Sequence, residues 1–198
     1  MNLHSYVSPY IAAVNPQILV VVRVSTGPAT IAPDGSQTPS YATPGAFTGA
    51  ITGTELTVSA ITAGMLQVGQ AIVGAGVPDG TVIAELDSGT GGLGTYVLNQ
   101  APAAPIAAEP MTSSYMVLGQ LQALSSRDLR QIEGLNLQGT LRALYLTGDL
   151  EGVVRPTLKG GDLIILPDAS VWLVTLVPEP WNLTAGWTKA IVVLQNGS

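Results

Sequence analysis

The feature that most constrains this chain is a long segment with no lysine and no arginine. All seven basic residues lie outside the stretch between Val24 and Ser126, whereas six of the thirteen acidic residues lie inside it. The flanking parts hold seven acids and seven bases, so the formal net charge of -6 belongs to this stretch. So sharp a change of composition is typical of a segment inserted into a host domain. We therefore predict a discontinuous host domain, residues 1–44 and 113–198, and an inserted acidic domain, residues 45–112.

Both parts of the chain show the pattern of short β-strands. In the inserted part, apolar and small polar residues alternate, and glycine turns separate most runs, as in a small antiparallel β domain. In the host part, short strands recur at a spacing of about ten residues, which indicates a small barrel or sandwich. The predicted fold class is mainly β: a small antiparallel β-barrel or sandwich with one short helix, plus an inserted small β domain. The predicted strands are 18–24, 37–42, 47–51, 55–61, 70–73, 80–84, 95–98, 115–124, 141–146, 152–155, 163–166, 171–177 and 187–194, with an exit linker at 102–105.

The one predicted helix covers residues 126–133. Ser125 can cap its first turn, and Asp128 places a carboxylate near the free amides and the positive end of the helix dipole. Leu129 and Ile132, continued by Leu135, are expected to form the apolar face. Gly134 is a natural stop signal for the helix.

The sequence offers little support for catalysis or cofactor binding. Residues 89–94 read Gly-Thr-Gly-Gly-Leu-Gly, which matches the dinucleotide fingerprint, but that motif needs a helix starting at its third glycine. Residues 95–98 form a predicted strand instead, so a flexible hairpin loop is expected. The single histidine, His4, lies in an N-terminal segment without a local catalytic partner. We predict no enzyme activity and no cofactor.

Metal binding and membrane insertion are not expected either. The chain has no cysteine and one histidine, and its aspartates in glycine-rich turns are expected to be turn formers: Asp34, Asp79, Asp87, Asp149, Asp162 and Asp168. No apolar run reaches the roughly 18 residues that span a bilayer, and the N-terminus lacks the basic start of a signal peptide. The acidic balance disfavours a broad phosphate-binding surface, although DNA could pass nearby without being gripped.

Low charge leaves two interpretations of the surface. Charged residues make up only 10% of the chain, against about a quarter in an average protein, so the surface is either rich in Thr, Ser and Gly or covered by other subunits. The candidate subunit-contact residues are Arg127, Leu129 and Arg130 of the predicted helix, with Trp181 and Trp187 around a loop. For Arg127 and Arg130, together with Asp128 and Glu133, a solvated helix face is the first interpretation and an intersubunit salt bridge is the second. Closure of one barrel end, or a platform for carbohydrate or peptide, is the alternative for the tryptophans. Trp172 lies in an apolar strand and is predicted to be core.

Without the inserted part, the chain shows four short motifs in order. These are Leu124-Ser125-Ser126-Arg127-Asp128-Leu129, Gly160-Gly161-Asp162-Leu163, Trp172-Leu173-Val174, and a last strand that ends at Gln195. Over residues 1–44 and 113–198 the chain thereby resembles the small β-barrel structural proteins of tailed bacteriophages, especially head–tail joining (neck) proteins. The inserted part, through residues 51–58, 68–70 and 89–96, resembles Gly/Thr-rich β modules of diverse virion proteins, which usually decorate the exterior.

The resemblance implies a virion structural protein that forms a homo-oligomeric ring and connects successive assemblies at the head–tail neck. Its partners would be other phage structural proteins, such as a portal, adaptor, tail tube or baseplate protein, and no catalytic residues are implied. The alternatives are a connector at the tail–baseplate junction, a carbohydrate-binding adhesion module and a small hydrolase. Exposed tryptophans flanking a groove would favour the adhesion module, and a buried carboxylate pair in a cleft would favour the hydrolase.

Overall fold

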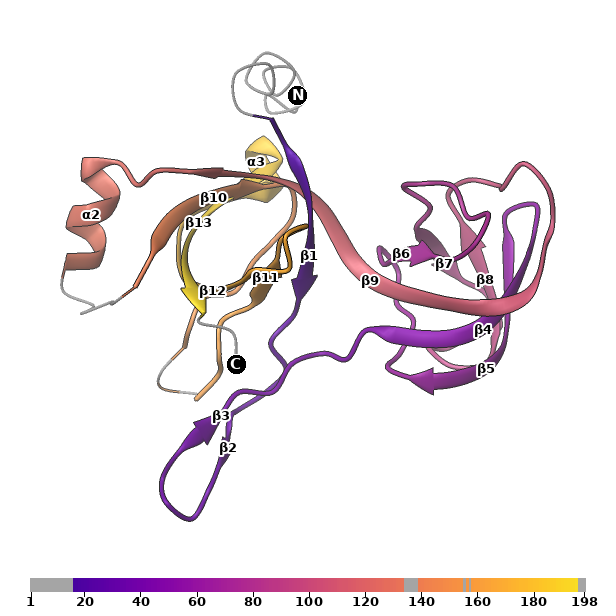
Figure 1. Cartoon of the computed structure of the whole chain (residues 1–198), viewed down its shortest axis with the longest axis horizontal. Coiled ribbons are helices and arrows are strands. Elements are labelled where there is room, and N and C mark those ends of the chain that lie inside the picture. Colours follow the sequence, from indigo (N-terminus) through magenta and orange to yellow (C-terminus); the bar gives the residue numbers. More distant parts are fainter. Residues whose placement is uncertain (1–15, 134–138, 155, 157, 196–198) are drawn as a thin grey trace. The chain divides into compact units, whose positions relative to one another are not determined.

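The chain folds into two compact units that are mainly β (Figure 1). The computed structural model describes residues 16–133, 139–154, 156 and 158–195. The host unit comprises Met1–Tyr41 and Val117–Ser198, and the insert comprises Ala42–Met116. The predicted insert, residues 45–112, is three residues shorter at its start and four at its end. Strands account for 52% of the chain and helices for 8%, so the predicted fold class is confirmed.

Six strands of the host unit close into a barrel (Figure 1). They pair in the order β1-β11-β12-β13-β10-β9, and β1 also pairs with β9, which closes the barrel. Of the two predicted forms, the host is therefore a barrel. Alternate apolar side chains on its strands are completely buried: Val20, Leu144, Ile164, Val174 and Val192. The strands are β1 (Ile18–Arg23), β9 (Ile106–Gln122), β10 (Leu141–Leu146), β11 (Leu163–Ile165), β12 (Val171–Trp181) and β13 (Trp187–Gln195).

Strand β13 is buried on both of its faces, from Thr188 to Val193. Successive side chains of a strand point to opposite faces, so Val192 points with its partner Val174 into the barrel, whereas Lys189 points outward. Helix α2 (Ser126–Ile132) contributes two buried residues, Asp128 and Ile132. A charged group buried in this way loses its hydration, and Lys189 therefore needs polar partners.

The Gly160-Gly161-Asp162 segment is more than the predicted turn. A Cβ atom on Gly161 would lie 1.8 Å from the carbonyl oxygen of Val174, so only glycine fits. The buried Asp162 carboxylate accepts hydrogen bonds from the backbone amides of Ser25 and Glu151, both at 2.8 Å. Asp162 thus ties the end of β1 to the segment before β11. Its assignment as a simple turn former was wrong because its carboxylate bridges residues distant in sequence.

The insert is a second small barrel-like set of antiparallel strands. Its strands pair in the order β9-β4-β5-β8-β7, and β6 pairs with β9. A bridge between Ala71 and Val82 joins β6 to the residues just before β7, so the pairing runs round the unit. The new strands are β4 (Gly45–Thr52), β5 (Glu55–Ala63), β6 (Ala71–Val73), β7 (Ile83–Leu86) and β8 (Gly94–Leu98). Their core holds Phe47, Ile51, Leu56, Val58, Leu66, Ile72, Ile83, Tyr96, Leu98 and Met111.

The glycine-rich loop at residues 89–94 joins β7 to β8 as a hairpin, as predicted. The hydroxyl of the buried Tyr96 accepts a hydrogen bond from the Gly91 amide at 3.1 Å and donates one to the Gly92 carbonyl at 2.6 Å. A Cβ atom on Gly89 would lie 2.3 Å from the Tyr96 ring, and Gly94 has a φ of +132°. The glycines therefore let this loop fold back over Tyr96.

The connections depart from the predictions in three places. Residues 102–105 do not lead out of the insert, because β9 begins at Ile106, pairs with β4 through Ser113 and continues to Gln122. The predicted strand 152–155 is reduced to a bridge between Val154 and Lys159, with residue 155 outside the described residues. The loop after Trp181 contains a second helix, α3 (Asn182–Ala185), which the prediction of a single helix missed.

The predicted strand 80–84 begins later, as β7, and local turn chemistry shapes the hairpin at residues 30–38. Strands β2 (Thr30–Ile31) and β3 (Gln37–Thr38) form a separate hairpin, and β3 ends just before Pro39, which cannot donate a backbone hydrogen bond. Asp34 closes this hairpin by accepting bonds from the Ser36 amide and hydroxyl, so it is a turn former as predicted. Asp168 does the same with Ser170.

Candidate functional site

Helix α2 presents three of the predicted contact residues to solvent. Arg127, Leu129 and Arg130 are exposed, and Leu129 retains 51% of its accessible surface. The prediction that Leu129 and Ile132 form a buried apolar face is therefore wrong for Leu129. The buried residues of the helix are Asp128 and Ile132. These two residues are four apart and so share one side of the helix. Leu135 and Gly134 lie outside the described residues.

The start of α2 is fixed by a reciprocal capping box. The Ser125 hydroxyl accepts a hydrogen bond from the Asp128 amide at 3.2 Å. The Asp128 carboxylate in turn accepts bonds from the Ser125 amide at 2.9 Å and from its hydroxyl at 2.7 Å. The predicted Ser125 cap is confirmed. The prediction that Asp128 belongs to a solvated face is wrong, because this side chain is turned into the protein.

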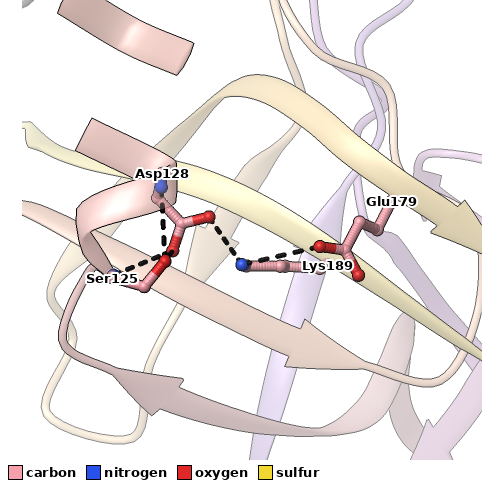
Figure 2. Close-up of polar contacts among 4 residues, drawn as sticks. All are labelled: Ser125, Asp128, Glu179 and Lys189. Carbon is pink, nitrogen blue, oxygen red and sulfur yellow. Dashed lines mark hydrogen bonds and ion pairs between the residues drawn. The ribbon is translucent and has the colours of Figure 1, made fainter. Parts of the chain in front are cut away.

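Asp128 also forms a buried ion pair with Lys189 (Figure 2). The Lys189 Nζ lies 2.6 Å from Asp128 Oδ1 and 3.7 Å from Glu179 Oε1. Figure 2 shows the ammonium between the two carboxylates, one from α2 and the other from β12. Only 7% of the Lys189 side chain and 3% of the Asp128 side chain remain exposed, so water barely screens their attraction.

Burial and pairing act in opposite directions on these two groups. Burial raises the pKa of Asp128, but hydrogen bonds from Lys189 and Ser125 outweigh it and hold the pKa below the ordinary aspartate value. Burial likewise lowers the pKa of Lys189, but its interactions with Asp128 and Tyr145 bring the pKa above the ordinary lysine value. The resting state of the pair is therefore ionic.

An aromatic strip lies on the same outer side of the barrel as Lys189. We use this name for Tyr145, Trp181 and Trp187. The Trp181 and Trp187 rings stack with centroids 6.1 Å apart, and Tyr145 lies 5.7 Å from Trp187. The Lys189 ammonium lies 5.5 Å from the Tyr145 ring centroid. Lys189 therefore contacts both Asp128 of helix α2 and Tyr145 of the aromatic strip.

The outer end of this strip is exposed and apolar. Trp181 retains 51% of its accessible surface, and Leu183 of helix α3 retains 94%. Trp187 is half-buried beneath Trp181. Trp172, by contrast, is 7% exposed, which confirms its predicted place in the core. Exposed large apolar side chains that lie close together mark a surface that another molecule can cover.

The insert offers a surface of different chemistry. Its five acids and absence of bases give it a formal charge of -5. Glu55, Asp79, Glu85 and Asp87 are exposed, and Glu109 is partly buried. Among the residues that the structure describes, no group of three or more His, Cys, Asp or Glu side chains could hold a metal ion.

A groove of about 450 Å³ lies in the host unit beside the β2–β3 hairpin. Its described lining residues are Ala29, Gln37, Pro39, Val153, Leu158, Lys159 and Gly160. These seven residues include one charged side chain and no carboxylate pair of the kind that the hydrolase alternative needs. His4 lies outside the described residues.

Within the described part of the chain, no helix is both long and apolar enough to cross a membrane. Comparison with known proteins gives no family model, no curated protein and no solved structure that matches this chain.

The sequence did not predict the contact of Lys189 with Asp128 and Glu179, which we call the Lys189 cluster. Lys189 is the one charged residue of an otherwise uncharged strand, Trp-Thr-Lys-Ala-Ile-Val-Val-Leu, and that is the available signal. A lone charge in a strand buried on both faces requires a partner of opposite charge. The sequence does not identify that partner, because Asp128 is 61 residues away.

Proposed function

We propose that this chain is a structural protein of a tailed-phage particle, and that its host barrel assembles into a ring joining successive assemblies at the head–tail neck. The observation that carries the proposal is the apolar surface at Trp181 and Leu183. This surface is exposed on the closed β-barrel of the host unit. The closed barrel itself has no free strand edge through which to associate, so a contact made by the barrel uses side-chain surfaces. The sequence resemblance to neck proteins is the reason for proposing that the assembly is a ring at the head–tail neck.

In this proposal α2 forms one face of the contact and the surface around Trp181 forms the other. A ring requires that one face of each subunit meet the different face of the next subunit, with a rotation that closes. Trp181 and Leu183 supply apolar area on one face, and Leu129 with Arg127 and Arg130 supplies apolar area and positive charge on the other. The acidic insert, with no basic residue, forms part of the exterior. A channel lined by host barrels, which carry few positive charges, would let DNA pass without gripping its phosphate backbone.

Particle assembly tests the contact surface. Trp181→Ala combined with Leu183→Ser removes exposed apolar area, and reversal of Arg127 and Arg130 to glutamate opposes the charge of the partner surface. Both double variants are expected to fold and to lower the yield of complete particles at least about tenfold. Ile31→Ser, at an exposed position of the β2–β3 hairpin, is the matched control and should assemble normally. Normal assembly by both double variants contradicts the proposal.

Two alternatives differ in what they predict for the same chain. A connector at the tail–baseplate junction would form a ring at the other end of the tail, which the position of the protein in particles distinguishes. A carbohydrate-binding adhesion module gains some support from the half-exposed Trp181, whose ring can stack on a sugar. Saturable binding to a glycan array, lost in Trp181→Ala, would favour that module over a ring.

A further inference from the structure

The Lys189 cluster contains the reactants of a covalent bond. The amine and carboxyl groups of Lys189 and Asp128 are in direct contact, at 2.6 Å, and the second carboxylate of Glu179 lies 3.7 Å from the same nitrogen. All three come from packed elements of the host barrel: β13, α2 and β12 (Figure 2). Groups held in contact react with effective concentrations far above those reached in solution.

We propose that Lys189 and Asp128 condense into an intramolecular isopeptide bond, with Glu179 carrying the proton. Glu179 accepts a proton from the ammonium, and the neutral Nζ attacks the Asp128 Cγ. The new N–C bond forms as one Cγ–O bond breaks, and the departing oxygen leaves as water. Of the three ammonium protons, one stays on the amide and two leave with that water, so Glu179 ends in its starting state. The reaction needs no oxidant, reductant or further reactant.

Ser125 is placed to assist this reaction. Its amide and hydroxyl both donate to Asp128 Oδ2, whereas Lys189 contacts Oδ1. When the amine adds to the carboxyl carbon, negative charge grows on the oxygen that does not leave, and two fixed donors already point at Oδ2. Oδ1, on the lysine side, is then the leaving oxygen.

The surroundings also favour the linked product. Lys189 and Asp128 are almost fully buried, and Tyr145 and Trp187 lie along the same side of the strand pair. Exclusion of water slows the reverse reaction, which is hydrolysis of the amide. Because the resting pair is ionic, the neutral amine is a minor species. The linked fraction should therefore grow with time after folding.

The mass of the intact chain under denaturing conditions tests the proposal. Incubated full-length protein should weigh one water molecule less than its sequence predicts. Trypsin should then release residues 128–130 joined to residues 160–198, because a modified Lys189 is not cleaved. Glu179→Gln, which keeps the shape of the side chain but cannot take up the proton, should slow linkage at least about 100-fold.

The chain contains its own control. Lys159 and Glu151 form a second ion pair, but their side chains are 26% and 56% exposed and this pair should stay unlinked, with normal cleavage after Lys159. Folded wild-type protein that keeps its full mass overturns the proposal. Linkage as fast in Glu179→Gln as in wild type overturns the role assigned to Glu179. Neither result depends on whether the protein forms a ring.

Discussion

Gly161 lies so close to Val174 that a Cβ atom at residue 161 would be 1.8 Å from the Val174 carbonyl oxygen. The contact brings the segment before β11 against β12, and the Val174 amide donates to the Asp162 carbonyl at 2.8 Å. The obstacle is backbone, which cannot rotate away as a side-chain tip can. This contact therefore joins two neighbouring strands of the barrel at a fixed separation.

Gly161→Ala should destabilise the host barrel by about 2–3 kcal/mol, because the strands must separate to admit one methyl group. Denaturant unfolding followed by tryptophan fluorescence measures the loss, since all three tryptophans lie in the host unit. Gly92→Ala is the control, because a Cβ atom there meets nothing within 4 Å. Equal stability of Gly161→Ala and the wild type would contradict so close an approach of the two backbones.

Tyr96→Phe should destabilise the insert by about 1–3 kcal/mol. Loss of the hydroxyl leaves the Gly91 amide and Gly92 carbonyl without their partner, and Gly91 is buried. Tyr115→Phe, which removes an exposed bond to Gln67, is the matched control and should cost less than about 1 kcal/mol. Hydrogen exchange at residues 89–94 reports the effect directly, and unchanged protection there would count against it.

The Lys189–Asp128 pair should make stability depend on pH in the acidic range. The measurement uses the Glu179→Gln background, in which the pair stays ionic. Since the folded-state pKa of Asp128 is lowered, its contribution is fully present above the ordinary value of 3.8 and is lost as the pH falls through the folded-state pKa. Breaking such a buried pair by Asp128→Asn should cost about 3–5 kcal/mol near neutral pH.

An acid titration separates this pairing from a general effect of the substitution. The comparison is between the Glu179→Gln protein and the same protein that also carries Asp128→Asn, because only the first keeps a carboxylate beside Lys189. The difference in their free energies of unfolding should shrink as the pH is lowered from about 5 toward 2. A difference that stays constant over the whole range would show that the ion pair does not contribute.

The host barrel should fold without the insert. Joining Tyr41 to Val117 through a linker of about eight Gly and Ser residues removes the insert but keeps the part of β9 that pairs with β10. Loop-closure cost grows slowly with length, so cooperative unfolding and the near-ultraviolet signal of the tryptophans should persist. The insert expressed as residues 42–116 is the complementary control. Collapse of the shortened host would show that the two units depend on each other.

Patterns within single strands could be predicted from the sequence, but contacts between distant residues could not. Alternation and turn residues locate β4, β5, β8 and β13, and Ser125 marks the start of α2. The path of β9 was missed because Pro102 and Pro105 suggest an exit linker, whereas β9 begins directly after them at Ile106 and continues through Pro110. Closure of each barrel depends on pairing between strands far apart in the chain, which local patterns do not encode.

The same limit applies to the candidate site. The sequence places Arg127 and Arg130 on the polar side of a helix and an apolar surface near Trp181 in a loop, but it wrongly assigns Leu129 to the apolar face of that helix. It does not indicate that Asp128 turns inward, because an acid in a first turn is equally well satisfied in solvent. The partner of Lys189 becomes evident only from the packing of α2 beside β13.

Electron microscopy of assembled particles tests the central claim most directly. The account predicts several copies of this chain in a closed ring with rotational symmetry, with the surface around Trp181, Leu183 and α2 in contact with the neighbouring subunit. A monomer in dilute solution does not decide the matter, because a partner ring can provide the template. A single copy without symmetry, or absence of the protein from the particle, would contradict the claim.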